Sequence, residues 1–148
     1  MFSKLEKLYM QLDGDGVSVV NWNFESSTKA LYVTDEQTIS AIAVDHKAIT
    51  SPAEELCIIA EELAHHQTKT YYEITSDFNS PLELQNRLIA ETRAQKFSVH
   101  KCVSFEELLA VINEASYQDD EELAQQLGVP VHFLDRVMSV YGGKLGLY

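Results

Sequence analysis

Residues 51–68 read SPAEELCIIAEELAHHQT, and this stretch carries the strongest structural signal in the chain. It begins as a helical capping box, in which the hydroxyl of Ser51 and the carboxylate of Glu54 satisfy backbone N–H groups at a helix start. Proline follows the serine directly and suits the first helical position. An apolar run over 56–60 then leads into a polar segment. The pattern predicts a helix over 52–67.

The same serine and glutamate spacing recurs twice, at Ser80 with Glu83 and at Ser104 with Glu107. Each pair predicts a helix start. Helical spacing of apolar residues predicts the remaining helices. The helices expected are 3–12, 52–67, 81–101, 105–115, 119–127 and 130–141.

Three short runs rich in β-branched and aromatic residues precede the main helices, over 17–24, 29–34 and 38–45. Short polar turns separate them, which favours a small antiparallel sheet. We therefore expect an α+β fold with strands first and helices after. One domain over 1–148 is expected, with 117–148 as a C-terminal helical subdomain.

Composition limits the functions open to the chain. Its 148 residues carry a formal net charge of −12, which disfavours binding to nucleic acid phosphates. The acidic excess continues after residue 105, so a helix-turn-helix reading of 121–140 as a DNA reader is not supported. A basic protein partner, a metal or simple solubility remain open. No membrane span or signal peptide is evident, and Cys57 and Cys102 suit buried thiols, so we expect a cytoplasmic protein.

The polar end of the 52–67 helix holds the candidate chemistry. Glu61 and His65 are four residues apart and therefore share a helix face, with Glu62 beside them. This is the geometry of the H-E-x-x-H zinc helix, in which two ligands one turn apart hold the metal and the intervening glutamate activates water. Glu61 stands at the first ligand position, and a carboxylate can ligate zinc. A solvated helix face would give the same pattern.

Glu91 supplies a second candidate carboxylate. The spacing places it on the same helix side as Leu84, Leu88 and Ala94, within an apolar stripe. A carboxylate in such a stripe is costly unless something pairs with it. A metal, Arg93 or a backbone cap could serve as that partner.

Several runs together resemble the ImmA/IrrE family of metallopeptidases from phages and mobile elements. Residues 60–66, AEELAHH, resemble the family's AEELGHH form, and 91–97, ETRAQKF, resemble its E-x-x-A-x-x-F motif. The segments 101–108 and 122–129 resemble the parts that follow. The likeness extends over roughly 28–143.

The resemblance implies a zincin-like helical core and a cytoplasmic zinc-dependent hydrolase. Its expected partner is an XRE-type repressor of a prophage or mobile element, which it cleaves or inactivates. By position, the expected metal ligands are Glu61, His65 and Glu91, and the expected general base is Glu62.

Glu61 in place of histidine makes the expected ligand set more anionic. The ion would be a weaker Lewis acid, and manganese becomes an alternative to zinc. We expect either a slower peptidase with an alkaline-shifted pH optimum, or a relative that regulates its partner by binding alone. His66, Tyr71 and Tyr72 are candidates for contact with the ligands or the substrate, although surface or core packing would also explain them.

Overall fold

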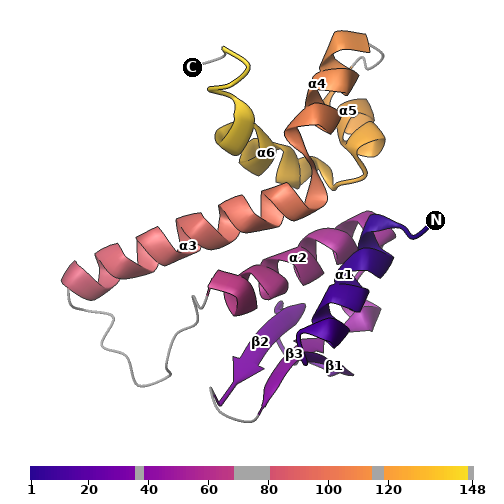
Figure 1. The fold of residues 1–148 in the computed structure, drawn as a ribbon. Coiled ribbons are helices and arrows are strands. Elements are labelled where there is room, and N and C mark those ends of the chain that lie inside the picture. The colour runs from indigo at the N-terminus through magenta and orange to yellow at the C-terminus, as the bar shows by residue number, and fades with distance from the viewer. Residues whose placement is uncertain (36–38, 69–80, 115–118, 147–148) are drawn as a thin grey trace.

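The computed structural model describes residues 1–35, 39–68, 81–114 and 119–146, and it has the α+β composition expected (Figure 1). Its elements are α1 (Lys4–Gly14), β1 (Ser18–Asn21), β2 (Ala30–Thr34), β3 (Ser40–Val44), η1 (His46–Ala48), α2 (Pro52–Thr68), α3 (Pro81–Cys102), α4 (Phe105–Glu114), α5 (Asp120–Leu127), η2 (Val131–Phe133) and α6 (Leu134–Tyr141). The helix predictions are thus confirmed to within a few residues. Ser80, the predicted cap of α3, lies outside the described residues.

Side-chain caps explain where two of these helices begin. At α4 the capping box is complete, because the Glu107 N–H donates to Ser104 Oγ at 3.1 Å and the Ser104 N–H donates to Glu107 Oε1 at 3.2 Å. At α2 the Glu54 N–H donates to Ser51 Oγ at 3.1 Å. The Glu54 carboxylate, however, accepts from the Thr50 N–H at 3.1 Å, one residue before the predicted donor. The box at α2 is therefore displaced by one residue on its carboxylate side.

The sheet differs from the expected antiparallel arrangement. Its strand order is β1-β3-β2, with β2 antiparallel to β3 but β1 parallel to β3. The antiparallel prediction is therefore wrong for β1. Consecutive strands were assumed to be neighbours, whereas the segment between β1 and β2 carries the chain past the place that β3 later fills.

One hydrophobic core joins the sheet to the helices. Ile42 and Val44 of the central strand are fully buried and belong to a cluster that runs from Leu8 to Tyr141. In Figure 1, α1 and α2 lie against the sheet, α3 crosses beyond α2, and α4, α5 and α6 gather at the far end of α3. α2 is thus packed between the sheet and α3, which places its polar end between several elements.

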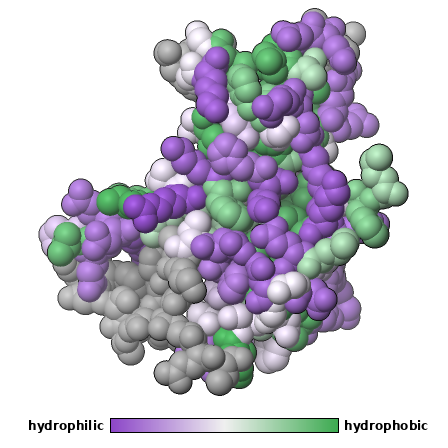
Figure 2. Space-filling model, viewed as in Figure 1, coloured by the Kyte–Doolittle hydropathy of each residue, from purple (hydrophilic) through white to green (hydrophobic). Residues whose placement is uncertain are grey.

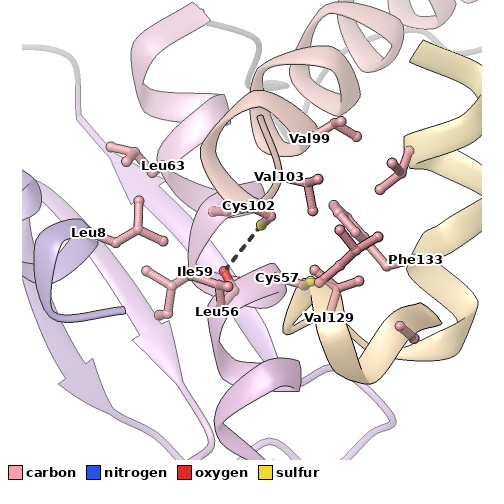
Figure 3. Close-up of a cluster of buried hydrophobic side chains, with 14 of the residues drawn as sticks. Leu8, Leu56, Cys57, Ile59, Leu63, Val99, Cys102, Val103, Val129 and Phe133 are labelled. Carbon is pink, nitrogen blue, oxygen red and sulfur yellow. Dashed lines mark hydrogen bonds between the residues drawn. The ribbon is translucent and has the colours of Figure 1, made fainter. Parts of the chain in front are cut away.

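The two cysteines lie at the centre of this core, as the sequence predicted. Both are buried free thiols, and Cys102 Sγ lies 4.0 Å from the carbonyl oxygen of Leu56 (Figure 3). Figure 3 also shows Phe133 and Val129 of the C-terminal part packing around Cys57 of α2.

The first half of α3 does not pack as expected. Leu84 and Leu88 are 46% and 69% exposed, while Ala94 is buried. The predicted apolar stripe around Glu91 is therefore wrong in its N-terminal part, because this half of α3 projects from the body of the molecule (Figure 1). Sequence periodicity shows that a helix is amphipathic but cannot show whether a neighbour covers its apolar side.

The rest of the surface matches the charge of the chain. Hydrophilic side chains dominate the face seen in Figure 2. Among the helices described, none has the length and apolar character needed to cross a membrane.

Candidate functional site

Strand β2 and the second half of α2 together build the candidate site. The backbone N–H of Tyr32 in β2 donates to the carboxylate of Glu62 in α2. The backbone hydrogen bonds between β2 and β3 explain why this N–H is available. The backbone N–H of Asp45 donates to the carbonyl oxygen of Lys29, and the backbone N–H of Asp35 donates to the carbonyl oxygen of Ile39. Odd-numbered residues of β2 therefore point their backbone groups toward β3. The N–H of Tyr32 therefore points away from the sheet, toward α2.

Glu62 lies in surroundings that favour its protonated form. Burial raises the pKa of its carboxyl, and the nearby Glu91 carboxylate raises it further. His65 and the Tyr32 N–H oppose the rise, but the net pKa stays above the ordinary value. A partly buried carboxyl with a raised pKa and ionisable neighbours on two helices is typical of functional sites.

His66 also contacts the strand. The Tyr32 hydroxyl lies 2.8 Å from His66 Nδ1, and the two rings meet edge-on with centroids 5.5 Å apart. His66 thus helps to hold α2 against β2, beside Glu62. Tyr71 and Tyr72 lie outside the described residues.

Glu61 has a different environment from Glu62. Its carboxylate forms an ion pair with the guanidinium of Arg136 in α6. The pair borders a pocket of about 360 Å³ between the start of β2, α2 and the C-terminal helices. The lysine, arginine, histidine and glutamate residues of the pocket lining are Lys29, Glu54, Glu61, Glu62, His132 and Arg136.

The side chains at this site are of the types that bind divalent cations, but their positions in this structure are not those of a metal site. Carboxylate oxygens and an imidazole nitrogen are common zinc ligands, and Glu62 feels the charges of both His65 and Glu91. Within the described residues, however, no three His, Cys, Asp or Glu side chains are arranged to hold one ion. Glu61 is directed to Arg136 instead. Of the four residues that the sequence indicated, the structure thus brings Glu62 near His65 and Glu91, and holds Glu61 in a separate ion pair.

Two residues of the site had no recognisable signal in the sequence. Tyr32 acts through its backbone N–H, whose direction depends on strand register. Arg136 stands out in an acidic segment as one of two basic residues after 105, but nothing local connects it to Glu61.

Comparisons of the chain with family models, with curated proteins and with solved structures found no match.

Proposed function

We propose that the chain is a cytoplasmic, metal-dependent peptidase with a zincin-like helical core. Its proposed substrate is an XRE-type repressor of a prophage or mobile element. The proposal rests on the resemblance of the runs around Glu62 and Glu91 to ImmA/IrrE metallopeptidases. One structural observation carries it, namely that Glu62 lies beside His65 on α2 and within electrostatic range of Glu91 on α3.

In the proposed site His65 and Glu91 would hold a zinc or manganese ion, and Glu61 would join them on leaving Arg136. The ion, when bound, would polarise a peptide carbonyl and make a water molecule more acidic. Glu62 takes the proton from the attacking water and passes it to the leaving amine. The Tyr32 N–H keeps the Glu62 carboxylate at one place during both transfers.

Metal content is the first test of this proposal. Protein purified without chelators is expected to contain about one zinc or manganese per chain, and His65→Ala and Glu91→Ala are expected to lose it. Glu83→Ala is a matched control, because Glu83 lies exposed on the same helix as Glu91. Loss of metal in the control, or no metal in the wild type after zinc is added, would contradict the proposal.

Turnover is the second test. The purified repressor of the same mobile element is expected to be cleaved by the wild type and not by Glu62→Gln. The substitution keeps the size and the hydrogen-bonding capacity of the side chain but removes its ability to take a proton.

A second function is favoured by the Glu61 ion pair. With its carboxylate engaged by Arg136, Glu61 is not directed to the other candidate ligands. The chain would then be a relative that inactivates its partner by binding alone. In that case Glu62→Gln would inactivate the repressor as well as the wild type does, without any cleaved product.

A further inference from the structure

The outer face of the sheet carries an apolar surface that the proposed peptidase site does not use. Side chains alternate between the two faces of a strand, so Ile42 and Val44 point into the core while Ala41 and Ala43 point outward. The outward residues of the flanking strands are apolar and exposed. We call the outer-face surface the set Val20, Trp22, Leu31, Val33, Ile39, Ala41 and Ala43.

Strand register gathers these side chains into one surface. Val20 of β1 and Leu31 of β2 both pair with Ala43, which makes one row across the three strands. Val33 pairs with Ala41 in the next row. The small alanines of the central strand leave the larger side chains on either side prominent.

The exposure of this surface is high for apolar residues. Val20 is 44% exposed, Leu31 51% and Val33 47%. Trp22 and Ile39, which extend the rows beyond the strand ends, are 60% and 59% exposed. A contiguous exposed apolar surface of this kind usually marks an interaction site, since scattered single residues would be normal but clusters are not.

This surface is separate from the candidate peptidase site. Tyr32 has the opposite orientation to Leu31 and Val33, and its hydroxyl reaches His66 of α2. The site therefore lies on the covered side of the sheet and the outer-face surface on the other. A partner on the outer face would leave the candidate site accessible.

Charge indicates what kind of partner suits the surface. Among the described residues of the strands and the segments next to them, the exposed acidic side chains are Asp15, Glu25 and Asp35, and the basic residues are Lys29 and Lys47. Lys29 is already paired with Glu54 of α2. A second copy of the chain would bring together two molecules that each have a net charge of −12, whereas a basic partner would be attracted to this charge. We propose that the outer-face surface docks a basic protein partner, whose exposed apolar side chains are surrounded by lysine and arginine.

The single tryptophan of the chain makes this proposal measurable. Because Trp22 belongs to the surface, a ligand that covers it shifts its fluorescence to shorter wavelength. The probe is a phage-displayed library of random peptides, selected against the full chain and then synthesised for titration. We expect selected peptides to be cationic and apolar, to shift Trp22 emission and to bind more weakly at high salt.

Matched variants distinguish this surface from general attraction to an acidic protein. Leu31→Ser with Val33→Ser is expected to weaken binding at least about tenfold, because it removes two apolar contacts at the centre of the surface. The control, Leu82→Ser with Leu88→Ser, removes two exposed leucines of α3 and should leave the affinity unchanged. Circular dichroism of both double variants establishes that they are folded.

Two results would overturn the proposal. The first is a set of selected peptides without excess lysine or arginine, or with equal affinity for the Leu31 and Val33 double variant. The second is a dimer in sedimentation velocity that this variant abolishes, which would make a second copy the occupant. None of these measurements involves metal or turnover, so the docking proposal can fail while the peptidase proposal stands, and the reverse.

Discussion

Replacing Arg136 with glutamine is expected to strengthen cation binding at the candidate site. Glu61 can serve as a metal ligand only after it leaves the guanidinium of Arg136. Breaking this ion pair costs free energy, and that cost weakens the binding of the metal. Removing the arginine frees the carboxylate in advance.

The size of the effect follows from the exposure of the pair. The side chains of Arg136 and Glu61 are 36% and 35% exposed, so solvent screens their attraction. Ion pairs of this kind contribute about 0.2–1 kcal/mol. At 1.4 kcal/mol for each tenfold change in affinity, the Kd for zinc should fall by at most about fivefold.

Isothermal titration of zinc and of manganese into Arg136→Gln and wild-type protein measures this change. Lys29→Gln is the matched control, because Lys29 lines the same pocket and its loss changes the net charge equally, but its partner is Glu54. The control should bind metal with nearly wild-type affinity. Unchanged or weaker affinity in Arg136→Gln, or an equal gain in both variants, would refute the idea that Arg136 competes with the ion for Glu61.

Three further predictions concern the scaffold. Phe133→Ala should lower the unfolding free energy by about 3–5 kcal/mol in urea denaturation, because the ring is fully buried; a loss below 1 kcal/mol would mean that the core closes over the gap. Lys29 holds the pKa of Glu54 at about 2 instead of 4.5, so its stabilisation is complete above pH 4.5 and is lost as the pH falls toward 2. Urea denaturation of Glu54→Gln across this range should therefore show a smaller loss than the wild type, and parallel curves would contradict the assignment. Cys57 and Cys102 should resist iodoacetamide in the native protein and react once it is unfolded, since both are buried and since a hydrogen bond with Cys102, together with burial, raises the pKa of Cys57; rapid native alkylation seen by mass spectrometry would disprove their burial.

Much of the helical structure could be predicted because its signals are local. The boxes at Ser51 and Ser104 place donors and acceptors three residues apart, and such contacts form within one helical turn whatever the rest of the chain does. Burial of Cys57 and Cys102 followed equally from their apolar neighbours. The helix that carries Glu62 could thus be located, and its polar end identified, from the residues alone.

The sheet was less predictable because strand pairing joins distant residues. Short polar turns suggested neighbouring antiparallel strands, whereas β3 lies between β1 and β2 and runs parallel to β1. The same register decides that the Tyr32 N–H points to Glu62 and that Leu31 faces outward.

By itself, the sequence determined the helices, the acidic charge and the presence of paired carboxylates beside His65. The tertiary structure alone decided that Glu91 of α3 lies near Glu62, and that Glu61 pairs with Arg136. The physical reason is the distance along the sequence between the residues that interact. A helix face is set by neighbours three or four residues away, but an ion pair between residues 75 positions apart depends on how the whole core packs.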